Sequence, residues 1–148
     1  MKKIVCLLLY LVGYESSAQD STVVSTTNFI YMTVGSTAAV SINANFERTI
    51  IRRSKDYISV KAGVGHRASF TFGQRTLSLG LVQVFGCGNK HFEWAAGVVH
   101  LYEQGFTSKF VADVKAGYRY SKPKGHFLFR TGLGYPEGVY ASVGIAYQ

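Results

Sequence analysis

The stretch Lys109–Ser121, KFVADVKAGYRYS, decides the fold of this chain. Taken two residues at a time, it separates into two faces. One face carries Phe110, Ala112, Val114, Ala116, Tyr118 and Tyr120, and the other carries Val111, Asp113, Lys115, Gly117, Arg119 and Ser121. Because successive side chains of a β-strand point to opposite sides, this alternation predicts a strand with one apolar and one polar face. The residues that follow, Lys122–Gly125 (KPKG), predict a chain reversal.

The same alternation recurs along the rest of the chain. It predicts eight strands, over 28–35, 39–50, 57–65, 75–85, 91–102, 109–121, 126–135 and from 139 to the C-terminus. The connections are short, and the longest predicted loop is 66–74. The pattern slips near Gln83, which falls among apolar positions, so a β-bulge or a different register is expected between Val82 and Phe85. The lengths suit tilted membrane-spanning strands of ~9–11 residues, and an even strand number brings both termini to one side.

Glycine placement predicts which face is outside. The polar faces of the strands carry Gly35, Gly63, Gly65, Gly80, Gly97, Gly117, Gly132, Gly134 and Gly144. A sheet surface facing water would favour larger polar residues, whereas the interior of a narrow barrel has little room. The sequence therefore predicts a closed, eight-stranded, antiparallel, up-and-down transmembrane β-barrel with its apolar face towards lipid. Tyrosines near the strand ends fit the aromatic girdles of such barrels (Tyr118, Tyr120, Tyr135, Tyr147). The alternative is a secreted soluble ligand-binding barrel with the apolar face inward.

The first 18 residues have the pattern of a secretory signal peptide. Lys2 and Lys3 precede an apolar run, and Ser16 and Ala18 form a small-residue cleavage site. We therefore expect export through the general secretory pathway, a flexible lead-in over 19–27 and a barrel over 28–148. Removal of Lys2, Lys3 and Glu15 leaves 14 basic and 7 acidic residues, a net charge of +7. For an exported chain the expected counter-charge is anionic lipid rather than nucleic acid. Cys87 is then the only cysteine, so no internal disulfide is expected.

The chain resembles the small eight-stranded outer-membrane β-barrel proteins of Gram-negative bacteria, a loosely characterised group. The residues that carry the resemblance are Ser41-Ile42-Asn43, Asn45-Phe46-Glu47-Arg48, Ala116-Gly117-Tyr118-Arg119-Tyr120 and Lys122-Pro123-Lys124-Gly125-His126-Phe127. The Ala18-Gln19 junction and the last strand fit as well, although the chain ends in Gln148 rather than in an aromatic residue. The resemblance implies a monomer in the bacterial outer membrane, with membrane lipids and the barrel-assembly machinery as partners.

Charged residues on the predicted inner face form one candidate site. They are Glu47, Lys61, Glu93, Asp113, Lys115, Arg119 and Arg130. We interpret them as an ion-pair network that neutralises buried charges and fills the lumen. Glu47, Glu93, Arg119 and Arg130 are expected in the periplasmic half. The alternative is a gate, or a narrow path for protons or small ions.

Basic residues in the turns at the predicted periplasmic end form a second candidate site. They are Arg52, Arg53, Lys55, Lys122 and Lys124. We expect them to contact phospholipid head groups of the inner leaflet. Solvated turn charge is the alternative interpretation.

The sequence offers little for catalysis. The resemblance also admits lipid-modifying enzymes of the lipid A deacylase or acyl transferase type, which is the alternative function. A deacylase would need Ser, His and an acid together at the lipid-facing rim. The pairs His66 with Ser69 and His100 with Glu103 have no recognisable spacing. We predict a structural or interaction role, with no catalytic residue, metal or cofactor.

Overall fold

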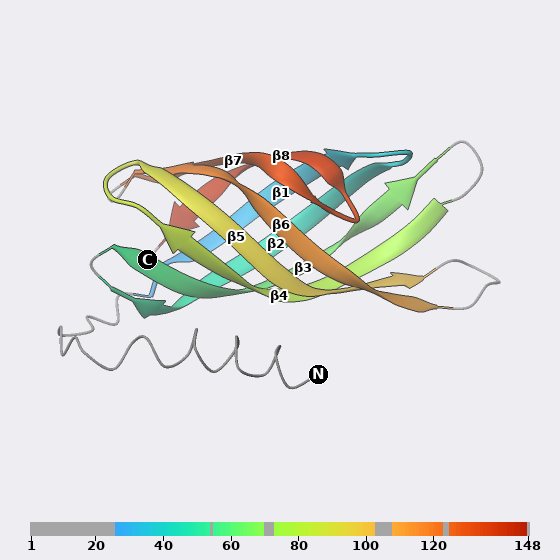
Figure 1. The fold of residues 1–148 in the computed structure, drawn as a ribbon, viewed down its shortest axis with the longest axis horizontal. Helices are drawn as coiled ribbons and strands as arrows, with labels where there is room; N and C mark the ends of the chain where they lie inside the picture. Colours follow the sequence, from blue (N-terminus) through green and yellow to red (C-terminus); the bar gives the residue numbers. More distant parts are fainter. Residues whose placement is uncertain (1–25, 54, 70–72, 103–107, 123–124, 148) are drawn as a thin grey trace, which may run out of the picture.

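The computed structural model describes residues 26–53, 55–69, 73–102, 108–122 and 125–147. They form eight strands, β1 (Asn28–Ser36), β2 (Val40–Arg52), β3 (Asp56–Ala68), β4 (Gly73–Phe85), β5 (Lys90–Tyr102), β6 (Lys109–Ser121), β7 (Phe127–Tyr135) and β8 (Gly138–Tyr147). Each strand pairs with its neighbour in sequence, and β8 closes the barrel by pairing antiparallel with β1 (Figure 1). The prediction of a closed eight-stranded antiparallel barrel is confirmed. The predicted signal peptide lies outside the described residues. In the described part of the chain, no helix is long and apolar enough to cross a membrane.

Burial alternates along the strands, with apolar side chains outside. On β1, Ile30 and Met32 are about half exposed, whereas Phe29, Tyr31 and Thr33 are buried inside the barrel. The alternation on β2 is the same, with Asn43, Asn45 and Glu47 inside. The inner face is therefore the polar one, as the glycine positions predicted.

The two chain termini of the barrel lie at one of its ends. Asn28 pairs with Tyr147, so β1 begins and β8 finishes at the same end, which we call the terminal end. The turns between β2 and β3, between β4 and β5 and between β6 and β7 also lie there. The other end, called the loop end, holds the remaining four connections (Figure 1).

The predicted loop at 66–74 was too long. The β3–β4 ladder continues through His66 and Arg75, Arg67 and Gln74, and finally Ala68 and Gly73. His and Arg side chains at the end of β3 obscure the apolar alternation. Backbone pairing nevertheless continues to Ala68, since the ladder needs only N–H and C=O groups.

Of the two expectations for the region near Gln83, a bulge or a different register, the structure shows neither. β4 pairs without interruption with β3 and β5 through this region. Val82 and Val84 are fully buried inside the barrel, where they join an apolar cluster with Phe29, Tyr31, Tyr57, Ala95, Leu128 and Ala146. Gln83 lies on the outer face, and its Oε1 accepts a hydrogen bond of 3.2 Å from Trp94 Nε1. The pattern slipped because the inner face contains a small apolar core.

The bulge lies instead in β2. The register with β3 shifts between Thr49 and Ile51, so Ile50 is an extra residue in the ladder. Ile50 and Ile51 are therefore both exposed on the outer face, 44% and 39%. The alternation restarts after them, which brings Arg52 to the inner side of the strand.

Candidate functional site

The half of the lumen nearer the terminal end holds four charged side chains. Arg119 Nη1 lies 2.8 Å from Glu47 Oε1 and 3.5 Å from Glu93 Oε2. Arg130 Nε lies 2.7 Å from Glu93 Oε1, and its Nη1 lies 3.4 Å from Glu47 Oε2. Each arginine thus contacts both carboxylates, and all four side chains are at most 2% exposed. The cluster has two positive and two negative charges, so its members compensate one another in the barrel interior.

Aromatic side chains cover this four-residue cluster. The Arg119 guanidinium lies 4.2 Å from the centre of the Phe29 ring and 5.5 Å from that of Tyr57. The Arg130 guanidinium lies 4.6 Å from the Tyr31 ring. These contacts are within the range of cation–π attraction and exclude water from the charges.

A second charged cluster lies nearer the loop end. Lys61 Nζ is 2.7 Å from Asp113 Oδ2, and Lys115 Nζ is 3.4 Å from Asp113 Oδ1. Lys115 Nζ also lies 2.6 Å from Glu137 Oε2. This cluster again has two positive and two negative charges, and its side chains are at most 9% exposed.

Glu137 was not predicted as a member of the network. It follows Pro136 in the β7–β8 turn, so its position suggested an exposed turn residue. Gly138 follows with a φ of +72°, a conformation that glycine adopts readily. The Glu137 carboxylate instead lies in the lumen, where Oε1 accepts a hydrogen bond of 2.9 Å from Asn43 Nδ2. The excess of interior lysines over nearby acids on the strands was the one sequence signal for such a partner.

Glycines separate the partners in the second cluster. In the register of β3 to β6, Lys61 pairs with Gly80, Gly80 with Gly97, and Gly97 with Asp113. Lys61 and Asp113 therefore lie in one row with two glycines between them. With no side chains on the two intervening strands, the lysine can extend along the inner wall to the carboxylate.

A second row has the same arrangement in the first cluster. Tyr140 pairs with Gly132, Gly132 with Gly117, and Gly117 with Glu93. The Tyr140 hydroxyl donates a hydrogen bond of 3.1 Å to Glu93 Oε1. A Cβ atom on Gly117 would lie 2.7 Å from that hydroxyl oxygen. The inner glycines thus leave the space through which long side chains reach partners three strands away.

The two clusters close the lumen. Tyr31, Lys61, Lys115, Arg130 and Tyr140 are among the residues around the space between them, and this space is too small to hold a water molecule. All seven charged side chains that the sequence placed on the inner face lie in these two clusters. They bind one another, and the barrel interior is filled with side chains.

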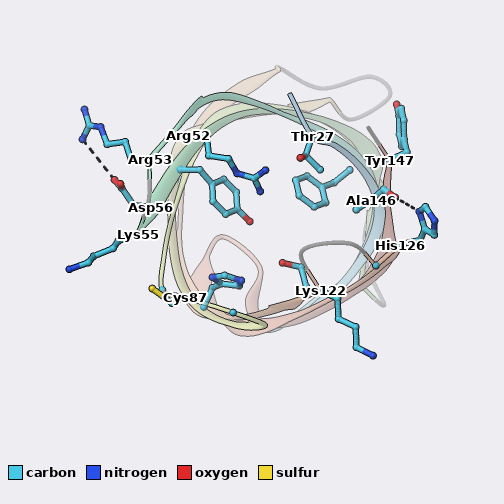
Figure 2. Close-up of a pocket in the computed structure, with 17 residues that line it drawn as sticks. Thr27, Arg52, Arg53, Lys55, Asp56, Cys87, Lys122, His126, Ala146 and Tyr147 are labelled. Carbon is cyan, nitrogen blue, oxygen red and sulfur yellow. Dashed lines mark hydrogen bonds and ion pairs between the residues drawn. The ribbon is translucent and has the colours of Figure 1, made fainter. Parts of the chain in front are cut away.

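A cavity of about 540 Å³ opens at the terminal end. We call it the basic mouth; its lining residues include Thr27, Arg52, Tyr57, Cys87, His91 and Lys122. Figure 2 shows Arg52 pointing into the opening, whereas Arg53, Lys55 and Lys122 point away from it. The sequence grouped these four cations as equivalent turn residues. The β2 bulge separates Arg52 from the others, and Lys124 lies outside the described residues.

The residues considered for catalysis are dispersed or lie outside the described residues. His66 is an exposed residue within β3, and the His100 ring on β5 lies 4.6 Å from the Phe110 ring on β6. Glu103 lies outside the described residues. Within the described ranges no group of three His, Cys, Asp or Glu side chains could hold a metal ion.

Comparisons with known proteins show the fold and no closer relationship. No protein-family model matches the chain, and no curated protein matches it. The N-terminal β-barrel domain of OprF from Pseudomonas aeruginosa is similar in structure, with a TM-score of 0.50 and 12% sequence identity. The match covers 82% of this chain and 96% of that domain. A de novo designed transmembrane β-barrel has a TM-score of 0.49 and 16% identity, over 82% of this chain and 93% of the design.

Proposed function

We propose that this chain is an integral outer-membrane β-barrel with a structural or interaction role and a closed lumen. The observation that carries the proposal is the distribution of side chains between the two faces of the wall. Leu77, Leu79 and Leu81 on β4 are each more than half exposed on the outside. Ion pairs occupy the inside. A soluble barrel would place these two sets the other way round.

The exposed apolar surface extends around the barrel. Each strand contributes large apolar side chains to it, for example Ile42 on β2, Val98 on β5, Leu133 on β7 and Val143 on β8, all 48–65% exposed. A continuous apolar belt is far larger than the few hundred Å² that monomeric soluble proteins expose. Lipid is the solvent that suits it, because the closed ladder leaves no unpaired strand edge.

The terminal end faces the periplasm in this proposal. An even number of strands joined by short turns puts both termini of bacterial barrels on that side. Arg53, Lys55 and Lys122 point outward there (Figure 2), where they contact anionic head groups of the inner leaflet. We further propose export by the general secretory pathway, which the pattern of residues 1–18 supports, and insertion by the barrel-assembly machinery.

The closed lumen favours a structural or interaction role over transport. Two neutral clusters lie across it, and the space between them does not admit water. An eight-stranded barrel is generally filled by its own side chains. The remaining surfaces for function are the two ends and the apolar wall.

Fractionation of cells that produce the full chain tests the proposal. We expect the protein in the outer-membrane fraction, resistant to extraction by salt and alkali. On unboiled gels the closed barrel should migrate differently from the boiled chain, since its hydrogen-bonded ladder resists detergent below the melting temperature. A protein recovered only from the soluble periplasm would overturn the proposal.

A further inference from the structure

The basic mouth combines an inward-pointing arginine with a defined cavity. Arg52 points into it, whereas Arg53, Lys55 and Lys122 lie at its edge and point away (Figure 2). Asp56, an acid at the same edge, lies 4.0 Å from Arg53 Nη1. The volume of the mouth, about 540 Å³, lies within the range of ~300–1,000 Å³ typical of small-molecule sites.

Arg52 is directed into this cavity by the fold. An uninterrupted β2 would turn residue 52 outward, alongside Arg48 and Ile50. The extra residue at the bulge reverses its direction, and its guanidinium lies 5.6 Å from the Tyr57 ring. A bulge that re-aims a side chain is a common device next to binding sites.

Polar atoms without partners line the same cavity. Thr27 is 6% exposed, and its hydroxyl has no hydrogen-bond partner among the described residues. The Thr27 hydroxyl oxygen points into the opening in Figure 2. Nδ1 of His91, the second residue of β5, has no partner in strict hydrogen-bond geometry, but this ring is half-buried and backbone groups of Gly86, Gly88 and Ser121 lie close to it. Buried polar groups are nearly always paired, so the Thr27 hydroxyl indicates a ligand or ordered water in the cavity.

We propose that the basic mouth is a binding site for a phosphate group. The Arg52 guanidinium supplies a planar fork that can donate two hydrogen bonds to phosphate oxygens. The Thr27 hydroxyl and the His91 ring supply donors from two other segments around the opening. Donors that approach from several directions fit a tetrahedral oxyanion better than a planar carboxylate. The phosphate can belong to a lipid head group at the barrel rim or to a soluble phosphate monoester.

Cys87 provides the measurement, since it is exposed and lines the cavity. The protein without residues 1–18, in which Cys87 is the only cysteine, is folded in a nonionic detergent and titrated with glycerol 3-phosphate in one arm. In the other arm the detergent is supplemented with phosphatidylglycerol. The rate of Cys87 alkylation by a small maleimide is followed in both. We expect saturable slowing, and the arm in which it occurs identifies the source of the phosphate. Unchanged alkylation in both arms would overturn the proposal.

Matched variants separate a site from general attraction to a basic surface. Arg52→Gln should weaken binding about tenfold, as expected for loss of a charged hydrogen bond. Arg53→Gln removes the same charge from the next residue, which points outward, and should weaken binding far less than Arg52→Gln does. Thr27→Val should weaken binding about threefold without altering charge. Equal weakening by Arg52→Gln and Arg53→Gln would show that no specific site exists. Because the titration is done in detergent, its failure is distinct from a failure of membrane fractionation.

Discussion

Lys61 and Asp113 form an ion pair of 2.7 Å although they belong to strands that are not neighbours. Gly80 and Gly97 occupy the two positions between them in the row. The same arrangement joins Tyr140 to Glu93 across Gly132 and Gly117. The interior of this barrel therefore contains rows in which two long side chains meet across the two glycines that lie between them.

The first prediction concerns the two ends of the Lys61–Asp113 pair. Asp113 contacts two lysines, Lys61 at 2.7 Å and Lys115 at 3.4 Å. Asp113→Asn leaves Lys61 buried without a carboxylate, and we expect it to cost about 3–5 kcal/mol of unfolding free energy. Lys61→Met should cost less, because Asp113 keeps Lys115 as a partner.

Urea unfolding of the protein folded in lipid or detergent measures both variants. Lys55→Gln is the matched control, since Lys55 is exposed at the terminal end and should change the free energy by less than ~0.5 kcal/mol. If Lys61→Met were the more destabilising variant, the assignment of Asp113 as the shared partner would be wrong.

The second prediction concerns the space that the interior glycines leave. A Cβ atom on Gly97 would lie 2.6 Å from the Gly80 Cα. Backbone cannot move aside as a side chain can, so Gly97→Ala should lower the unfolding free energy by about 1–3 kcal/mol.

Gly73→Ala is the control for this effect. Among the described residues, a Cβ atom there would meet only the His66 ring, at 3.3 Å, and that side chain is exposed and can move. We expect the free energy of unfolding to be nearly unchanged. Equal effects of the two substitutions in urea titrations would show that close approach at Gly97 is not the cause.

Sequence alone was sufficient for the strands and for the direction of their faces, because both depend on local alternation and on glycine placement. The sequence was less informative about which interior side chains bind one another across the lumen. These contacts depend on the stagger between strands that closure imposes, and a single strand carries no information on that stagger. Lys61 was correctly placed inside, but its link to Asp113 rather than to Glu47, its cross-strand neighbour, required the closed barrel.

Two further features were missed for a different reason. Ile50 and Ile51 would suit either the outer face or the apolar inner core, so apolar character could not locate the bulge between Thr49 and Ile51. Glu137 lies next to a turn proline, a position that favours exposure, and only tertiary contact with Lys115 and Asn43 turns it inward. Two features therefore became visible only in the structure: the inward direction of Arg52, and the contact of Glu137 with the second charged cluster.

The third prediction concerns conductance. Because the two neutral clusters fill the lumen, the wild-type protein should show no conductance steps in planar lipid bilayers. Glu47→Gln preserves side-chain volume and should be equally silent. Discrete steps from the wild type that Glu47→Gln abolishes would instead establish a charged path through the barrel.

The fourth prediction is that the outer face of the barrel wall meets lipid. Two neighbouring residues on β8 test it. Val143 is 54% exposed on the outer face, and Ser142 is 2% exposed inside, where its Oγ lies 2.8 Å from Thr33 Oγ1. In a Cys87→Ser background, Val143→Cys in lipid vesicles should react with a membrane-soluble maleimide and not with a charged, water-soluble one. Ser142→Cys is nearly isosteric and should react with neither, because the filled lumen blocks access. Reaction of Val143→Cys with the water-soluble reagent would place the apolar wall in water.

Unboiled gels of both variants verify that the barrel is closed, so a difference in labelling reports the environment of each side chain rather than unfolding.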